Sequence, residues 1–383
     1  MSQSLLPNGC YDLLPPHARQ ESVLSYQLLE IFHRYGYEQV SPPLLEFSDH
    51  LLSGRGADLS EQIFRVMDPA ALKVMGIRPD ITLQIARIAG GRLADVPRPL
   101  RLCYDGMILR MKAQGIKSER QFRQVGIELM GTPHPDADAE VIMVAAQALK
   151  HIGIDALCID ISLPTLAQAV IAESKLSDST QQSLLLAIQQ KDISAVRSHS
   201  FAYQALLLAM MQLPSNAPAA LAAIESMAIP DVFKAGMDDL VSVTRSVLAQ
   251  APASWQVTLD ITEVSAMNYH SGPCFSFFLP DSSLEIGRGG RYTIEHESSI
   301  ESATGFTLYV DTVQSSLPPQ AQARKILVAQ TATPEEIQQL HCDGYLTLRA
   351  LSGHGDLMHQ AAQLGCEAVF AQGKLQPRTG HKS

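Results

Sequence analysis

The sequence lacks the features that mark membrane and secreted proteins. Its apolar runs, such as residues 205–211, are far shorter than the ~20 residues that a membrane-spanning helix needs. Residues 1–14 contain no basic segment followed by an apolar stretch, so we expect no signal peptide. These absences predict a soluble, cytoplasmic protein without a membrane partner.

Cysteine is also scarce and has no pattern. The six cysteines are scattered without a CxxC pair or a Cys/His cluster, which argues against structural zinc and against a disulfide framework. The 12 histidines are dispersed without metal-ligand spacing. The sequence therefore predicts no metal and no cofactor.

Positive charge is in short supply. The chain has 29 Lys and Arg against 39 Asp and Glu, a net charge of -10, whereas phosphate-backbone binding calls for a basic surface. We therefore expect no nucleic-acid partner, although an acidic average can hide one basic patch. With 46% hydrophobic residues over 383 positions, the chain can bury a large core, and its length favours two or three structural units.

The order of helix-like and strand-like patterns predicts an α+β fold. We expect helices at 19–35 and 136–152, a strand at 38–40 and a hairpin within 102–130. These elements assign residues 1–164 to one unit, to which strands at 255–261 and 274–279 add residues 254–317. Residues 165–253 are rich in Ala, Leu, Gln and Ser and predict a helical insertion.

The segment after Pro318 has a different pattern. Strands at 325–329 and 345–350 with helices at 334–340 and 353–364 predict a small α/β domain over residues 318–383, with the last ten residues frayed. The segment Gly287–Arg291 predicts a tight turn between strands. It does not predict a phosphate loop, because no Lys-Ser/Thr follows it and no evident helix begins there.

Polar side chains share one face of the predicted hairpin. Period-two spacing puts Gln124, Gly126 and Glu128 together, and the same spacing brings Tyr104 and Arg110 to that surface from the preceding strand. An arginine, an amide and a carboxylate on one sheet surface can form a pocket for a small zwitterion. The alternative is an exposed sheet face with ordinary surface charges.

A second polar pair precedes the hairpin. Asp80 and Thr82 stand two residues apart in an Arg-Pro-Asp-Ile-Thr segment, so in extended backbone they lie on one side and can bind an ammonium group. The alternative is that the Asp and Thr help to start a helix.

These segments resemble the signature segments of histidyl-tRNA synthetases and occur in the same order. The resemblance covers roughly residues 5 to 312, and the helical insertion matches only in position. The segments that carry it are Leu6–Asp12, Arg78–Thr82, Leu102–Gly131, Asn268–His270 and Gly289–Tyr292.

The resemblance implies a class II aminoacyl-tRNA synthetase-like antiparallel sheet flanked by helices, with a helical insertion and a small C-terminal α/β domain. It also implies a set of histidine-binding residues, with Arg110 on the carboxylate side and the Tyr269-His270 pair near the imidazole. The set is Asp80, Thr82, Arg110, Gln124, Glu128, Tyr269 and His270.

The departures from the synthetase pattern concern ATP. Ser118, Ser265 and Thr312 stand where the resemblance implies arginines that handle the nucleotide. Adenylation needs positively charged side chains in contact with the ATP phosphates, and losing even one such side chain typically costs orders of magnitude in rate. Nearby lysines and arginines are the alternative source of that charge.

The sequence therefore resembles the regulatory subunits of ATP phosphoribosyltransferase, which are relatives of the synthetases without catalytic residues. The resemblance implies a short-form catalytic subunit as partner, activation of it in the first step of histidine biosynthesis, L-histidine as feedback ligand, and a self-dimer within a hetero-oligomer. A divergent histidine-activating ligase that uses ATP is the alternative, and an RNA-binding sensor of the same fold is a third.

Overall fold

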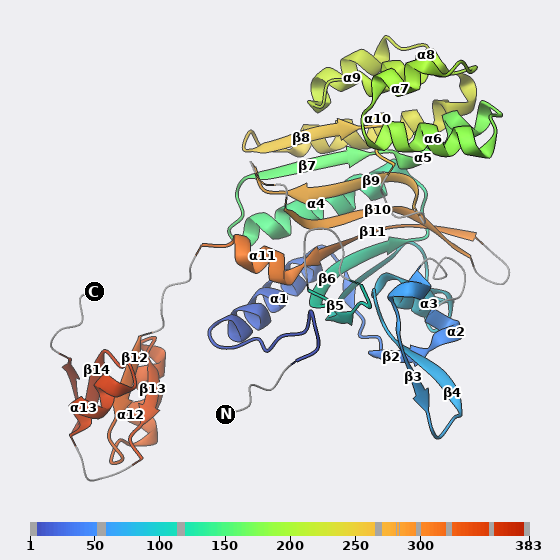
Figure 1. Ribbon diagram of the computed structural model, residues 1–383. Coiled ribbons are helices and arrows are strands. Elements are labelled where there is room, and N and C mark those ends of the chain that lie inside the picture. The colour runs from blue at the N-terminus through green and yellow to red at the C-terminus, as the bar shows by residue number, and fades with distance from the viewer. Residues whose placement is uncertain are drawn as a thin grey trace. The chain divides into compact units, whose positions relative to one another are not determined.

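The computed structural model describes residues 6–51, 59–112, 119–264, 270–280, 282, 284–295, 300–318, 324–351 and 356–378. The chain divides into two compact units, Met1–Leu317 and Pro318–Ser383. Figure 1 shows the elements of each unit.

An eight-stranded sheet is the frame of the larger unit. Its strands follow the order β1-β5-β6-β11-β10-β9-β7-β8, and neighbours are antiparallel except for the parallel pairs β1–β5 and β7–β8. The strands are β1 (Glu38–Gln39), β5 (Leu100–Leu109), β6 (Gln121–Met130), β7 (Leu157–Ser162), β8 (Trp255–Asp260), β9 (His270–Phe278), β10 (Glu285–Glu295) and β11 (Ile300–Tyr309). The predicted hairpin is the β5–β6 pair.

Helices cover one face of this sheet. They include α1 (His17–Arg34), α4 (Pro135–His151) and α11 (Val310–Ser316). Val125, Ile127 and Leu129 alternate along β6 with the polar residues and join the buried core that these helices share. The sheet therefore has an apolar helical side, and its polar hairpin face points the other way.

Smaller elements lie on the opposite face, near β5 and β6 (Figure 1). They are α2 (Ser48–Leu51), α3 (Thr82–Gly90) and a three-stranded sheet of β2 (Leu45–Phe47), β4 (Lys73–Ile77) and β3 (Phe64–Asp68). Ile81 and Ile85 belong to one buried cluster with Tyr104 and Ile108 of β5. This packing holds the start of α3 against the hairpin.

The segment between β7 and β8 folds into helices α5 (Pro164–Glu173), α6 (Asp178–Gln189), α7 (Ile193–Ser198), α8 (Gln204–Met211), α9 (Ala217–Glu225) and α10 (Asp231–Gln250). Local signals start several of them: Ser177, Asp192 and Asn216 cap α6, α7 and α9 through their side chains. Helix α10 packs on α4 and β9, which ties the insertion to the main sheet.

The C-terminal unit is an α/β sandwich. It contains β12 (Lys325–Val328), α12 (Pro334–Cys342), β13 (Leu346–Arg349), α13 (Leu357–Gln363), β14 (Ala368–Ala371) and β15 (Lys374–Pro377), with the sheet order β13-β12-β14-β15. The α+β fold class predicted from the sequence is confirmed. The prediction that the last ten residues are frayed is wrong for Lys374–Pro377, because these residues pair with β14.

The prediction of a turn at Gly287–Arg291 is also wrong. This segment lies inside β10, an 11-residue strand paired with β9 and β11. Its glycines leave no room for side chains. A Cβ at Gly289 would lie 2.2 Å from the carbonyl oxygen of Gly305, and a Cβ at Gly287 would lie 2.7 Å from the carbonyl oxygen of Thr307. Glycine marks close approach of neighbouring strands here, and no change of chain direction.

Candidate functional site

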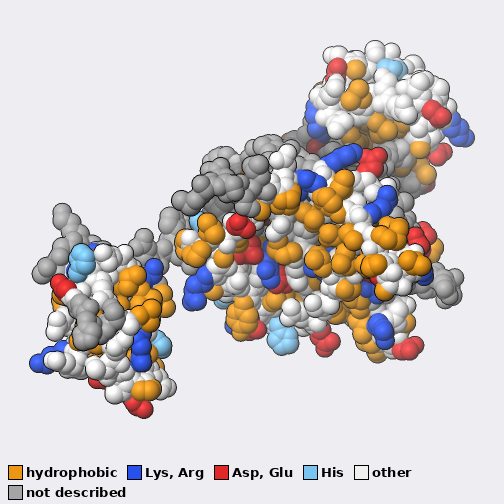
Figure 2. Space-filling view, turned by 60° about the horizontal axis from the view of Figure 1, so that its bottom comes forward, with side chains coloured by type: hydrophobic (Ala, Val, Ile, Leu, Met, Phe, Trp, Pro, Cys, Tyr) orange, Lys and Arg blue, Asp and Glu red, His pale blue; other side chains and the backbone are white. Residues whose placement is uncertain are grey.

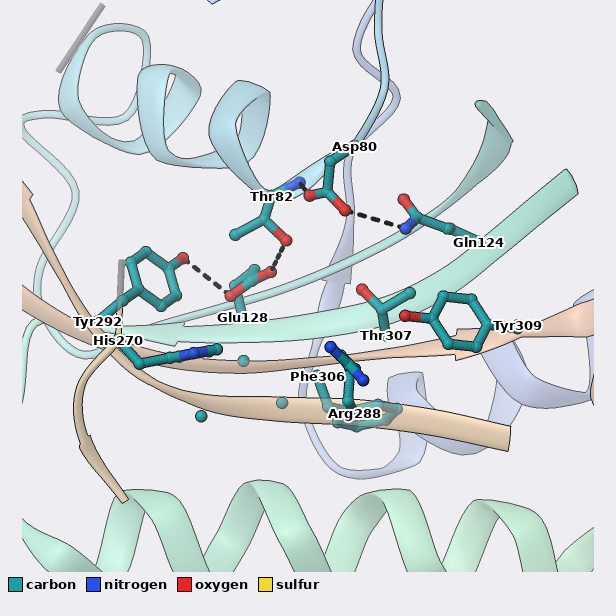
Figure 3. A pocket seen from close by; sticks show the side chains of 13 residues that line it. Asp80, Thr82, Gln124, Glu128, His270, Arg288, Tyr292, Phe306, Thr307 and Tyr309 are labelled. Carbon is teal, nitrogen blue, oxygen red and sulfur yellow. Dashed lines mark hydrogen bonds between the residues drawn. The ribbon is translucent and has the colours of Figure 1, made fainter. Parts of the chain in front are cut away.

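A pocket opens on the polar face of the main sheet, where β6, β11, β10 and β9 run beside the start of α3 (Figure 3). It encloses about 360 Å³ of empty space, including its open mouth. Its lining consists of Asp80, Thr82, Gln124, Glu128, His270, Arg288, Gly289, Gly290, Tyr292, Gly305, Phe306, Thr307 and Tyr309.

Glycines form the floor of the pocket. Gly305 of β11 pairs in register with Glu128 of β6 on one side and with Gly290 of β10 on the other. A Cβ at Gly305 would lie 1.7 Å from Glu128 Oε2, and one at Gly290 would lie 2.7 Å from His270 Cδ2. The missing side chains leave the room that the carboxylate and the imidazole occupy.

Glu128 is the most deeply buried acid of the pocket, with 1% of its surface exposed. Thr82 Oγ1 donates to its Oε1 at 2.9 Å, and the Tyr292 hydroxyl donates to its Oε2 at 2.9 Å. Burial raises the pKa of Glu128 to about 8, although these hydroxyl donors act in the opposite direction. Glu128 is a preoriented acceptor for an N–H group.

Asp80 connects the start of α3 to the hairpin. Its Oδ1 accepts from the backbone N–H of Thr82 at 2.9 Å, and its Oδ2 accepts from Gln124 Nε2 at 3.0 Å. The prediction of extended backbone at this pair is wrong, because Ile81 has helical φ and ψ and Thr82 begins α3. Asp80 supports the first turn of that helix and also lines the pocket. Gln124 Oε1 is buried and has no hydrogen-bond partner within the described part of the chain, so it remains an acceptor for an incoming donor.

Arg110 lies beside Asp80 and is absent from the pocket lining as described. Its Nη2 is 3.6 Å from Asp80 Oδ2, its Nε donates to the Pro79 carbonyl at 2.9 Å, and its guanidinium lies over the Phe122 ring. Arg110 therefore supports Asp80 without belonging to the lining that the described residues form.

Five of the seven site residues predicted from the sequence line this pocket: Asp80, Thr82, Gln124, Glu128 and His270. Tyr269 lies outside the described residues. The sequence reasoning missed Arg288, Tyr292, Thr307 and Tyr309. Reading Gly287–Arg291 as strand would have found two of them, because period-two spacing puts Arg288, Gly290 and Tyr292 on one face.

A second cavity lies beside α11. It encloses about 690 Å³ of empty space, open mouth included, and is lined by Tyr11, Glu119, Leu284, Asp311, Thr312 and Ser315. No lysine or arginine belongs to this lining in the described parts of the chain. Burial raises the pKa of Tyr11 to about 12, and the carboxylates of Asp311, Glu21 and Glu119 add to the rise. The cavity is therefore acidic.

The fold and the pocket place the chain in a known class. The family model of histidyl-tRNA synthetase matches residues 9–313, and the chain belongs to this family. A structure described as an ATP phosphoribosyltransferase regulatory subunit/histidyl-tRNA synthetase from Bacillus halodurans C superposes with a TM-score of 0.80 at 23% identity, covering 96% of this chain and 97% of that one. The histidyl-tRNA synthetase of Nostoc sp. PCC 7120 gives 0.76 at 17%, covering 96% and 91%.

Sequence relatives define the branch of the family. An ATP phosphoribosyltransferase regulatory subunit from Rhodospirillum centenum is 40% identical over 98% of this chain and 96% of its own. One from Gluconobacter oxydans is 37% identical over 98% of both chains. The chain thus belongs to the ATP phosphoribosyltransferase regulatory subunits, a family of regulatory rather than catalytic subunits, as the sequence predicts.

Within the described residues, no helix has the length and apolar character needed to cross a membrane.

Proposed function

We propose that this chain acts in the cytoplasm as the non-catalytic regulatory subunit of ATP phosphoribosyltransferase, which carries out the first step of histidine biosynthesis. It binds and activates a short-form catalytic subunit and mediates feedback inhibition by L-histidine. The observation that carries the proposal is the pocket in which the side chains of Glu128 and Asp80 present two carboxyl groups to one small ligand.

The polar groups of the pocket match the donors of histidine. Glu128, oriented by Thr82 and Tyr292, accepts the imidazole N–H. Asp80 and the buried Gln124 Oε1 accept the ammonium group. A site whose buried acceptors need these donors rejects ligands that lack them, because the acceptors would then remain unsatisfied.

The second cavity supports a role without ATP chemistry. Glu119 and Asp311 line it together with Thr312, at a position where synthetases are expected to carry an arginine. Carboxylates repel nucleotide phosphates, and the described lining offers no lysine or arginine to offset them. Ser118 and Ser265, the other two expected replacements, lie outside the described residues.

Histidine acts in this proposal by shifting the equilibrium of the complex. Coupling of about 1–3 kcal/mol between the pocket and the catalytic subunit is typical of allosteric proteins. Linkage requires that the active complex bind histidine more weakly than the inhibited one.

An exposed apolar sheet face supports the self-dimer. The register of β2, β4 and β3 puts six apolar side chains on the face turned away from Glu46, and all of them are partly or largely exposed. Figure 2, which brings the bottom of Figure 1 forward, shows hydrophobic side chains gathered on the larger unit. The six are Leu45, Phe47, Phe64, Val66, Met75 and Ile77. A second copy of the chain can cover this face.

The variant Val66→Asp tests this interface, because it puts a charge on the apolar face. It should shift the dimer toward monomer in sedimentation equilibrium. A dimer that does not shift would have its interface elsewhere.

The decisive experiment measures phosphoribosyl-ATP formation by a short-form catalytic subunit with and without this chain, each with and without histidine. We expect this chain to raise the rate and histidine to lower it only when the chain is present. Glu128→Gln and Asp80→Asn should abolish the inhibition and keep the activation, while Glu225→Gln, an exposed change on α9, should keep both. No effect of the chain on the rate would refute the proposal.

A further inference from the structure

The proposed histidine site has acceptors for the imidazole and the ammonium group but still needs a partner for the ligand's carboxylate. Arg110, the residue predicted for this role, is held by Asp80 and the Pro79 carbonyl outside the described lining. An unneutralised carboxylate next to Asp80 and Glu128 would be strongly disfavoured at a buried site. The position of the other cations around the pocket therefore decides how the carboxylate is held.

Arg288 is the only arginine or lysine in the described lining of the pocket. Strand pairing puts it on the pocket face, because Arg288 of β10 is in register with Thr307 of β11. In Figure 3, Arg288 lies near Thr307, away from the end of the pocket where Tyr292 and Glu128 meet. The pocket thus has an acidic end at Glu128, where an imidazole ring can bind, and a positively charged wall at Arg288, away from that end.

Glu285 restrains the guanidinium of Arg288. The Arg288 Nε donates to Glu285 Oε1 at 2.6 Å, and Nη2 donates to Oε2 at 2.5 Å. This two-point pair fixes the plane of the guanidinium, which lowers the conformational entropy lost when a ligand binds. The Arg288 side chain remains 37% exposed, so a ligand that enters the pocket mouth can reach it.

Charged groups of both signs lie around Tyr309, which also lines the pocket. Burial raises the pKa of Tyr309 to about 12, the nearby carboxylates of Glu285 and Asp80 raise it, and the guanidinium groups of Arg288 and Arg110 lower it. Asp80 and Arg288 line the pocket together with Tyr309. A negative and a positive group around one ring match the ammonium and carboxylate of an α-amino acid.

We infer that Arg288 recognises the carboxylate of the bound amino acid and makes the site selective for histidine over imidazole amines that lack a carboxylate. The inference rests on the proposed histidine site and names the residue that binds the carboxylate of the ligand. Arg288 acts as a specificity-determining residue, and Glu285 positions it.

The test is calorimetric titration of the full-length chain with L-histidine, L-histidinol and histamine, which share the imidazole and the ammonium group. The wild type should prefer histidine to the two ligands without a carboxylate. Arg288→Gln should weaken histidine binding by roughly 10- to 100-fold, as expected for a hydrogen bond to a charged group. Its affinity for histamine should stay the same or rise, which also shows that the pocket is intact.

Two further variants sharpen the result. Arg288→Lys keeps the charge without the planar fork and should retain part of the preference for histidine. Arg245→Gln removes an arginine that pairs with Glu225 on the exposed surface of the insertion and should change no affinity. An Arg288→Gln protein that still prefers histidine as strongly as the wild type overturns the inference and leaves the histidine site standing. A wild type that binds none of the three ligands overturns the histidine site itself.

Discussion

Gly305 and Glu128 face each other across β11 and β6, and a single methyl group on Gly305 would fall 1.7 Å from the Glu128 carboxylate. The central acid of the pocket therefore exists in this position only because its neighbour has no side chain. The same row of the sheet continues to Gly290, whose missing side chain makes room for His270. The shape of the pocket is a property of four neighbouring strands, β6, β11, β10 and β9.

Gly305→Ala should move Glu128 out of its hydrogen bonds with Thr82 and Tyr292. We expect histidine binding to fall by more than about tenfold and the free energy of unfolding to fall by about 1–3 kcal/mol, the usual range for overpacking. Titration calorimetry and urea unfolding measure the two effects. Gly236→Ala in α10 is the matched control: its Cβ would meet its nearest neighbour at 3.6 Å, so stability should stay the same or rise. If Gly305→Ala and Gly236→Ala had the same effect on histidine binding and on the free energy of unfolding, the close contact between residue 305 and Glu128 would be contradicted.

The raised pKa of Glu128, about 8, predicts a pH dependence of stability. Between roughly pH 5 and 8 the folded chain keeps a proton on Glu128 that the unfolded chain releases, so this group makes the free energy of unfolding fall as pH rises. Glu128→Gln removes the titration. The stability of this variant relative to the wild type should therefore increase across that range and level off above it. Urea unfolding at several pH values measures the difference, and a difference independent of pH would be the opposing result.

Arg291 joins three elements and should be a stability residue. It pairs with Asp138 of α4 and with Asp239 of α10, and Thr304 Oγ1 donates to Asp138 at 2.6 Å. Asp138 is fully buried, so Arg291→Met should leave an unpaired carboxylate and cost about 3–5 kcal/mol. The fluorescence of Trp255, the one tryptophan of the chain, reports unfolding of this unit.

Two comparisons test the cause of that loss. The double variant Arg291→Met with Asp138→Asn should recover part of the stability, because the buried charge is gone. Arg245→Met, which breaks the exposed pair with Glu225, should cost at most about 1 kcal/mol. If Arg291→Met were as mild as Arg245→Met, the network would have little part in joining α10 to the sheet.

The acidic second cavity predicts that the chain does not activate histidine. Histidine-dependent exchange of pyrophosphate into ATP should stay at background, because Glu119 and Asp311 repel the phosphates. A histidyl-tRNA synthetase assayed in parallel shows that the conditions are adequate. Exchange above background that disappears in Glu128→Gln would instead identify a divergent ligase.

Strand periodicity allowed much of the pocket to be predicted from sequence. The alternation along residues 121–130 put Gln124 and Glu128 on the face opposite Ile127, and the structure has them there, because a strand's side chains point to alternate faces whatever its partners are. The spacing of Asp80 and Thr82 predicts a shared side of extended backbone, but Ile81 between them is helical and Thr82 begins α3; both residues nevertheless line the pocket. Both pairs depend on local backbone geometry.

The glycine-rich segment Gly287–Arg291 shows where that reasoning stops. Three glycines in five residues indicate a turn when only local conformation is considered. In the structure, a Cβ on any of these glycines would clash with a group on another strand: the Thr307 carbonyl, the Gly305 carbonyl or the His270 ring. A turn at this segment gives Arg288 and Tyr292 no shared face, so local sequence alone does not predict them as pocket residues.

The sequence by itself determined the fold class and the polar face of the hairpin with Gln124 and Glu128, because these depend on periodicity within one segment and on the order of the segments. Spacing also paired Asp80 with Thr82, whereas His270 follows only from the resemblance to histidyl-tRNA synthetases. Only the tertiary structure decided that Arg288 lines the pocket, that Arg110 pairs with Asp80, and that Gly305 makes room for Glu128. These relationships arise from the register between strands far apart in the chain, which no single segment encodes.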